Sequence, residues 1–248
     1  HAMIDLHCHI LPGVDDGPQS VEESLAMAET ALRDGIRTLV ATPHMLNGLY
    51  ENDLAGARSG LASLEKELVK RGLPLRLHVG GDVHVVPGMV EAVRNGSAVT
   101  IDDGRKYLLL ELPSQSVPTG VKEEIFQLRI HGITPIITHP ERNPVVSRDK
   151  ELLRELVEMG ALAQVTAMSL TGDFGEEVRD VAEILLKRRL VHVMASDAHS
   201  PHDRPPVLSR GVEAAARILG RPDEAERMVT EIPAAILAGE PVEVPEPA

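Results

Sequence analysis

Short apolar runs alternate with amphipathic stretches along the chain, and this alternation restricts the fold more than any other feature. Seven runs suit buried parallel strands, which are continuous segments rich in Val, Ile and Leu. They cover residues 4–7, 36–42, 75–80, 107–112, 133–138, 162–167 and 191–196. Stretches with helical spacing lie between them, at 20–35, about 51–71, 118–131, 147–159, 174–188 and 206–219. In the first stretch, Ser20 and Glu23 predict a capping box and Gly35 a C-terminal stop.

Repeated strand-then-helix units predict an α/β fold with right-handed crossovers and a mostly parallel sheet. Seven such units are enough to close or nearly close a barrel, and an open doubly wound sheet is the structural alternative. The 248 residues fit one domain of barrel type. We place this domain at residues 3–238, with residues 1–2 as a cloning remnant and the Pro-rich, acidic tail 239–248 loosely held.

The composition argues against several classes of protein. The formal net charge is −13 and no basic stripe is present, so nucleic acid is not expected as a partner. Cys8 is the only cysteine, which excludes an intrachain disulfide and favours a reducing, cytoplasmic compartment. No apolar run reaches about 18 residues and no signal peptide precedes the first strand, so neither membrane insertion nor secretion is expected.

Potential metal ligands follow nearly every predicted strand. They are His7, His9, His44, Asp82, Glu111, His139, Asp197 and His199, with Asp15 and Asp16 in the loop after the first strand. The carboxyl ends of parallel strands share one face of a barrel, where barrel enzymes place their chemistry. Taken singly, a His is usually hydrogen-bonded or on the surface, and an Asp after an apolar run is often a helix cap. Their recurrence at strand after strand favours a common site.

The pair His7 and His9 indicates metal binding more directly. Side chains at i and i+2 of a strand point the same way, so both imidazoles can hold one ion while Cys8 faces the opposite side as a packed thiol. Position 14 is Val14, so Cys8 also lacks the arginine of a Cys-based phosphatase loop. Imidazole and carboxylate ligands without thiolates suit Zn, Mn or Fe. The eight residues at strand ends and one of the two loop aspartates make nine ligands, too many for one ion, and two or three clustered divalent ions are expected.

The remaining histidines are not expected to be ligands. His131, His192 and His202 are assigned structural positions, at a helix end, out of phase on a strand and in a loop. His78 and His84 are in phase with Asp82. They are candidates for groups that support the ligands.

Five segments together resemble a known superfamily. "DLHCHILPGVDDG", "TPHMLNGLYEN", "YLLLELP", "THPERN" and "SDAH" lie in order between about residue 4 and residue 210. They resemble the PHP (polymerase and histidinol phosphatase) superfamily, above all its bacterial metal-dependent protein-tyrosine phosphatases encoded with capsule and exopolysaccharide genes. The resemblance implies a distorted (β/α)7 barrel, a trinuclear metal site and hydrolysis of phosphotyrosine, typically on the tail of a tyrosine kinase that controls polysaccharide export.

The resemblance also implies a ligand set for each ion. His7, His9 and Asp197 would hold the first ion, Asp82 would bridge it to the second, Glu111 and His139 would complete the second, and Asp15, His44 and His199 would hold the third. Asp16 is the alternative to Asp15, and otherwise a residue that structures the loop or orients a water. Manganese is the first expectation for the ions, with zinc, iron or cobalt as alternatives.

Two positions depart from the family pattern. The usual Gly-x-Glu of the third strand is Gly80-Gly81-Asp82 here, with a side chain one methylene shorter. The second His of the usual Thr-Pro-His-His is Met45, which affects metal occupancy or substrate contacts unless it is a packing residue.

Clustered divalent ions supply hydroxide from a bound water near neutral pH and neutralise charge on phosphoryl oxygens. Arg142 and Arg204, which follow His139 and His199, are the candidates for binding phosphate oxygens, a task that suits the planar guanidinium. Surface ion pairing is their alternative role. A histidinol-phosphate phosphatase or another phosphoesterase of the same superfamily is the alternative enzyme. A metal-stabilised module that only binds a partner is the non-catalytic alternative.

Overall fold

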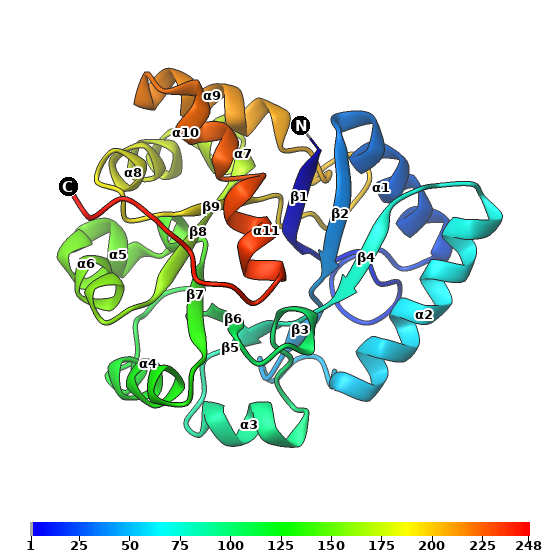
Figure 1. Cartoon of the computed structure of the whole chain (residues 1–248), viewed down its shortest axis with the longest axis horizontal. Helices are drawn as coiled ribbons and strands as arrows, with labels where there is room; N and C mark the ends of the chain where they lie inside the picture. Colours follow the sequence, from blue (N-terminus) through cyan, green and yellow to red (C-terminus); the bar gives the residue numbers. More distant parts are fainter. Residues whose placement is uncertain (1) are drawn as a thin grey trace.

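The structure is a computed structural model that describes residues 2–248, so His1 of the expected cloning remnant lies outside the described residues. The strands lie near the centre and the helices surround them (Figure 1). The strands are β1 (Met3–Cys8), β2 (Ile36–Ala41), β3 (His44–Met45), β4 (Arg76–Val79), β5 (Asp82–His84), β6 (Tyr107–Glu111), β7 (Thr134–Thr138), β8 (Leu162–Thr166) and β9 (Val193–Ala195).

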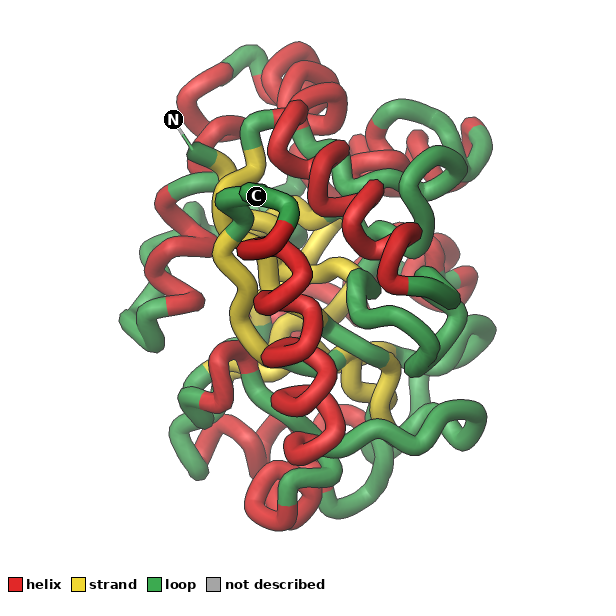
Figure 2. Tube along the Cα trace, turned by 90° about the vertical axis from the view of Figure 1, so that its right-hand side faces the viewer, coloured by secondary structure: helices red, strands yellow, loops and turns green. Residues whose placement is uncertain are grey.

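The helices follow the strands around the molecule, and Figure 2 shows them outside the strands in a second view. They are α1 (Val21–Asp34), α2 (Leu54–Lys70), α3 (Met89–Asn95), α4 (Val121–Ile130), α5 (Pro144–Arg148), α6 (Lys150–Glu158), α7 (Ala167–Leu170), α8 (Glu176–Lys187), α9 (Ser209–Leu219), α10 (Pro222–Arg227) and α11 (Glu231–Leu237), with short 3-10 helices η1 (Ile101–Asp103) and η2 (Pro140–Arg142). Across residues 2–248, each helix is too short or too polar to span a bilayer.

The strands form two sheets, and neighbouring strands pair in parallel as predicted. One sheet has the order β1-β2-β4, and the other has the order β3-β5-β6-β7-β8-β9. All the predicted strands are present. The short strands β3 and β5 were not predicted, because two or three paired residues leave no periodic signal in the sequence. The predicted helices are present with small shifts at their ends, and Ser20 caps α1 by accepting from the N–H of Glu23.

The chain itself joins the two sheets. β3 follows β2 after two residues, and β5 follows β4 after two glycines. On the other side, β1 lies beside the end of β9: the N–H of Asp197 donates to the carbonyl oxygen of His7 (2.8 Å), and the N–H of His9 donates to that of Ala198 (2.8 Å). Buried Asp5 adds to this junction, because its carboxylate accepts from the N–H of Ser196 (3.0 Å). These bonds fix the first and last strands relative to each other.

An aliphatic cluster lies below the strand ends that carry the expected ligands. Its strand residues are Leu6, Val40, Leu109, Ile136, Leu162 and Val193. Ile232 and Ile236 of α11 pack against it, and α11 crosses in front of the central strands in Figure 1. Leu109 and Glu111 are two residues apart on β6 and share a face, so Glu111 stands one layer further along the strand than the apolar cluster. Cys8 is buried in the other core cluster, as expected.

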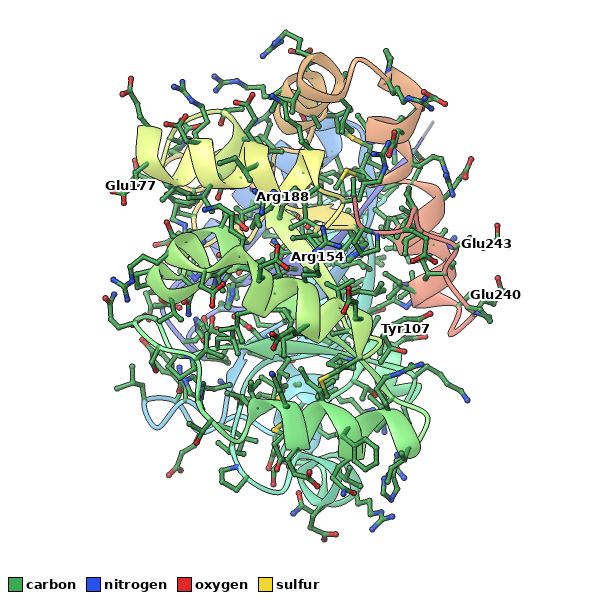
Figure 3. The ribbon with its side chains drawn as sticks, turned by 90° about the vertical axis from the view of Figure 1, so that its left-hand side faces the viewer. Tyr107, Arg154, Glu177, Arg188, Glu240 and Glu243 are labelled. Atoms are coloured by element: carbon green, nitrogen blue, oxygen red, sulfur yellow. The ribbon has the colours of Figure 1, made fainter. Side chains whose placement is uncertain are left out.

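The C-terminal tail, expected to be loosely held, is tied to the body by several contacts. The hydroxyl of Tyr107 donates to the carbonyl oxygen of Glu240 (2.5 Å), and these residues lie near each other in Figure 3. At the chain end, the N–H of Ala248 donates to the carbonyl oxygen of Arg188 (2.9 Å). Val242 and Val244 pack against the aliphatic cluster. The apolar valines at alternate positions explain why a Pro-rich acidic segment is nonetheless docked.

Candidate metal centre

The expected ligands from separate strand ends come together in three overlapping groups. These groups are His7, His9, Asp82 and Asp197; His9, Asp16, His44 and His199; and His44, Asp82 and Glu111. In each group, one nitrogen or carboxylate oxygen per residue lies within 4.8 Å of the others. Nitrogen and oxygen ligands that bind one ion at about 2.0–2.2 Å lie at most about 4.4 Å from each other. The groups therefore have nearly the spacing that a divalent ion imposes.

Asp82 lies at the centre of these groups. Its Oδ2 atom is 3.2 Å from Nε2 of His7 and 3.4 Å from both Nε2 of His9 and Nδ1 of His44. The side chain is shorter than the glutamate expected there, yet it reaches three imidazoles. Met45, the other departure from the family pattern, is fully buried in the core. A Cβ at Gly81 would lie 2.6 Å from the Met45 sulfur, so Met45 packs closely against this glycine.

Glu111 and His139 lie beside each other as expected, with 3.3 Å between Oε2 and Nε2. His44 also approaches Glu111, at 3.8 Å between Nδ1 and Oε1. His44 is thus shared between two groups, because its Nε2 faces Asp16 while its Nδ1 faces Asp82 and Glu111. The ligand set expected for the second ion did not include His44.

Asp15 and Asp16 lie opposite to the arrangement that the sequence predicts. Oδ1 of Asp16 lies 3.2 Å from Nε2 of His44 and 3.3 Å from Nε2 of His199. Asp15 faces away from that gap: its Oδ2 accepts from Nδ1 of His9 (2.9 Å) and from the N–H of His44 (3.0 Å). The structure thus places Asp16, and not Asp15, between the two histidines.

Three imidazoles are oriented by a hydrogen bond at Nδ1. Nδ1 of His7 donates to Oε1 of Gln164 (2.8 Å), and Nδ1 of His9 donates to Asp15. Nδ1 of His199 donates to the carbonyl oxygen of Asp197 (2.7 Å). Such bonds fix the tautomer and leave Nε2 free for a metal. Gln164 on β8 was not predicted. The signal was present, since it is a polar residue inside an otherwise apolar buried strand.

The electrostatics of the site favour cations. Burial alone would lower the pKa of His7, but the carboxylates of Asp197 and Asp82 outweigh burial and raise it to about 10. Burial would raise the pKa of Asp82, but His7 and His9 hold it well below its usual range. The acids therefore keep protons on neighbouring imidazoles. A ligating imidazole is neutral, so divalent ions would replace these protons as partners of the carboxylates.

Two buried polar atoms support the fit of the site to metal ions. Nδ1 of His44 and Oδ1 of Asp82 have no hydrogen-bond partner among residues 2–248. Orphaned buried polar groups are rare and costly. Two residues of the site also have strained backbone, because His139 and Asp197 have φ of 33° and 51° in the left-handed region that non-glycine residues avoid. The chain accepts strain at the residues that form the site.

Arg142 and Arg204 meet at the remaining oxygen of Asp197. Nη1 of Arg142 and Nη2 of Arg204 lie 2.8 Å and 2.9 Å from Oδ2, while Oδ1 lies 3.1 Å from Nε2 of His7. Asp197 thus joins the arginine pair to the histidine cluster. Both guanidiniums are partly exposed, at 27% and 29% of the side chain, so they remain accessible to a ligand.

The other histidines do not join the three groups. His78 of β4 pairs with Asp102 of η1 (3.0 Å), and His84 hydrogen-bonds the carbonyl oxygen of Val85 (2.9 Å). His192 is buried and accepts from the N–H of Ala163 (3.0 Å). His78 and His84 were predicted to support the ligands, but neither of these hydrogen bonds is made to a ligand residue.

Comparisons with known proteins agree with this arrangement. The chain is 39% identical over 202 residues to the tyrosine-protein phosphatase YwqE of Bacillus subtilis (strain 168), covering 82% of this chain and 79% of YwqE. It is 30% identical over 224 residues to the tyrosine-protein phosphatase CpsB of Streptococcus agalactiae serotype V, covering 88% and 92%.

A solved structure described as one of the metal-dependent tyrosine phosphatases YwqE from Bacillus subtilis and CpsB from Streptococcus pneumoniae superposes with a TM-score of 0.94. That match has 34% identity and covers 99% of this chain and 98% of the other. The family described as "Capsular polysaccharide synthesis, CpsB/CapC" matches residues 3–238. Family, relatives and fold agree over most of the chain, which therefore belongs to the CpsB/CapC family of capsular polysaccharide synthesis.

Proposed function

We propose that this protein is a metal-dependent protein-tyrosine phosphatase that acts in capsule or exopolysaccharide synthesis. The observation that carries the proposal is the meeting of imidazoles and carboxylates from separate strand ends beside two arginines. Relatives that are 30–39% identical over 202–224 aligned residues are named tyrosine-protein phosphatases. The CpsB/CapC match supplies the context of polysaccharide synthesis.

We propose that three divalent ions, manganese first, bind at ligand sets drawn from the three groups. The first set is His7, His9, Asp82 and Asp197, the second is His44, Asp82 and Glu111, and the third is Asp16, His44 and His199. His139 lies outside the three groups, and we propose that it joins the second set beside Glu111, from which it is 3.3 Å away. Asp16 replaces Asp15 as the ligand of the third ion because its oxygen lies between the two histidines. Asp15 then orients His9 through Nδ1.

When bound, such ions lower the pKa of a coordinated water and neutralise charge on the phosphoryl oxygens. The protein's own groups bind and orient the phosphate. Arg142 and Arg204 present planar, permanently charged guanidiniums that suit a phosphate dianion. Asp197 holds both on one side of the histidine cluster. Cys8 is not placed to act as a nucleophile, since it is buried in the core cluster on the far face of its strand.

We propose that the two sheets act as one distorted (β/α)7 barrel in a single domain at 3–238. The interrupted strands β2–β3 and β4–β5 each count as one position, and the hydrogen bonds between β1 and the end of β9 support closure. In this arrangement the metal groups lie at the carboxyl ends of the strands, where barrel enzymes place their chemistry. The aliphatic cluster and α11 fill the other end.

The substrate we propose is a phosphotyrosine-bearing protein, and more narrowly a tyrosine kinase that regulates polysaccharide synthesis. The names of the relatives support phosphotyrosine, and the family description supports the pathway. The −13 charge continues to argue against nucleic acid. A cytoplasmic location fits a single free, buried thiol.

The test is a comparison of substrates with metal-loaded protein. Initial rates on a phosphotyrosine peptide and on histidinol phosphate are measured with Mn, Zn, Fe, Co and Mg added to stripped protein. The proposal predicts a kcat/KM at least about tenfold higher for the peptide. Faster hydrolysis of histidinol phosphate would assign the chain to the other activity. An absence of metal-dependent turnover on both would favour a binding module.

A further inference from the structure

Phe174 contacts both arginines of the site. It lies in the turn between α7 and α8, and its ring centroid is 4.9 Å from Cζ of Arg142 and 5.4 Å from Cζ of Arg204. Arg142 belongs to the segment after β7 and Arg204 to the loop after β9, so one ring joins two loops that are distant in sequence. Each guanidinium is therefore held at two points, by the carboxylate of Asp197 and by this ring.

The geometry of these contacts leaves the arginines able to bind a ligand. A cation over an aromatic face within about 6 Å of the centroid is attracted by the ring quadrupole. Stacking covers the face of a guanidinium but leaves its N–H edges available for hydrogen bonds to a phosphate. Two positive groups that share one carboxylate oxygen also repel each other, and the negative face of the ring opposes that repulsion.

Backbone hydrogen bonds fix the turn that contains Phe174. The N–H of Asp173 donates to the carbonyl oxygen of Met168 (3.1 Å), and the N–H of Gly175 donates to that of Gly172 (3.0 Å). Both glycines have positive φ, 84° and 101°, which lets the chain reverse direction around the phenylalanine. The chain has only two Phe, two Tyr and no Trp. One of its few aromatic rings is thus held against the arginine pair.

We propose that Phe174 is a positioning residue that holds Arg142 and Arg204 in place for the phosphate group of the substrate. The inference rests on the proposed function, because it takes the arginines as the phosphate-binding groups. Phe174 acts through the guanidiniums and does not take part in the chemical step. Its removal weakens the binding of phosphate and leaves the ligands of the metal groups in place.

The experiment compares Phe174→Leu, Phe174→Tyr and the control Phe126→Leu. Phe126 undergoes the same change on α4, where its side chain is 51% exposed. The Kd of inorganic phosphate is measured by calorimetry on Mn-loaded protein, beside KM and kcat for a phosphotyrosine peptide and the bound metal per chain. Phe174→Leu is expected to raise Kd and KM about fivefold to thirtyfold, the range of two partly exposed cation–π contacts. Metal content is unchanged, and kcat changes less than about threefold.

Phe174→Tyr keeps the ring and is expected to restore Kd and KM to within about twofold of wild type, while Phe126→Leu matches wild type. When Phe174→Leu is introduced into an Arg204→Lys variant, it should raise Kd and KM by a smaller factor than in wild type, because lysine lacks the planar group that stacks. Wild-type phosphate affinity in Phe174→Leu would overturn the positioning role. If wild-type protein hydrolyses no phosphotyrosine peptide but Phe174→Leu still weakens phosphate binding, the proposed function fails and the positioning role stands.

Discussion

Asp15 and Asp16 are neighbours in the sequence, but their carboxylates face different partners. The side chain of Asp15 is fully buried against His9, while that of Asp16 is 50% exposed between His44 and His199. The nearby histidines hold the pKa of Asp16 below its usual range, with His199 the larger influence. The loop decides which acid faces the gap, because Oδ1 of Asp15 accepts from the N–H of Gly17 (2.9 Å) and turns Asp15 inward.

Asparagine substitutions at these two positions should therefore differ in their effect on metal content. We expect Asp16→Asn to lower the bound Mn by about one ion per chain, because it removes the charge between the two histidines. Asp15→Asn keeps the number of ions but weakens their affinity by about tenfold or more, as loss of an orienting partner does. Elemental analysis after dialysis against graded Mn measures both. Loss of an ion in Asp15→Asn but not in Asp16→Asn would reverse the assignment.

His192 is the residue with the clearest consequence for stability against pH. Burial lowers its pKa from 6.5 to about 4, and its side chain lies away from the metal groups. The unfolded chain therefore binds this proton more readily than the folded protein. The loss of unfolding free energy that His192 causes is absent above about pH 6.5. It grows as the pH falls toward 4, where it reaches about 3 kcal/mol.

His192→Asn removes this titration while keeping an acceptor for the N–H of Ala163. Between about pH 7.5 and about pH 5, urea unfolding of metal-free wild type should lose about 2 kcal/mol more than the variant. The test compares how steeply the free energy of unfolding of each protein changes with pH, and not the stability at one pH. Equal slopes for the two proteins would mean that His192 titrates normally in the folded state.

The sequence predicts the strands and their ends better than it predicts the paths of the loops. Strand ends in parallel sheets converge whatever the details of their loops, so periodicity and order were enough to predict His7, His9, Glu111 and His139 as candidate ligands of one site. The identity of the acid beside His44 depends on one turn in the first loop. The contact of Phe174 with two arginines depends on the path of a second loop. Such paths are set by local hydrogen bonds and tertiary packing, which no periodic pattern reports.

The tail is an element whose composition predicted the wrong behaviour. Pro and Glu residues suggested loose attachment, but Val242 and Val244 alternate toward the aliphatic cluster while Glu243 between them is exposed. Figure 3 shows the segment with Glu240 and Glu243 along one side of the molecule. The burial of these valines acts together with the hydrogen bonds of Glu240 and Ala248 against the entropy cost of ordering the segment.

Replacing both valines by alanine should destabilise the fold without affecting the metal groups. We expect Val242→Ala with Val244→Ala to cost about 1–2 kcal/mol and to lower Tm by roughly 2–8 °C. Glu243→Ala is the matched control and should leave Tm within about a degree. Thermal unfolding and bound Mn are measured on all three proteins. A Tm of the double variant equal to that of wild type would show that the tail is not docked in solution.

At the scale of the whole molecule, the fold separates two kinds of interior. One end is closed by aliphatic side chains and α11, and the carboxyl ends of the strands hold acids and imidazoles at hydrogen-bonding distance. Several carboxylates enclosed in a protein that already carries a formal charge of −13 require positive partners. In the metal-free protein the positive partners of the carboxylates are protonated imidazoles. In the active form that we propose, they are divalent ions.

The most direct test is a titration of stripped protein with Mn in which bound ions and turnover of a phosphotyrosine peptide are measured on the same samples. We expect turnover to appear only as two to three ions bind per chain, and we expect His9→Ala to lose both the ions and the activity while remaining folded. Full turnover by wild-type protein that holds less than about one ion per chain, or by His9→Ala with no bound metal, would contradict it.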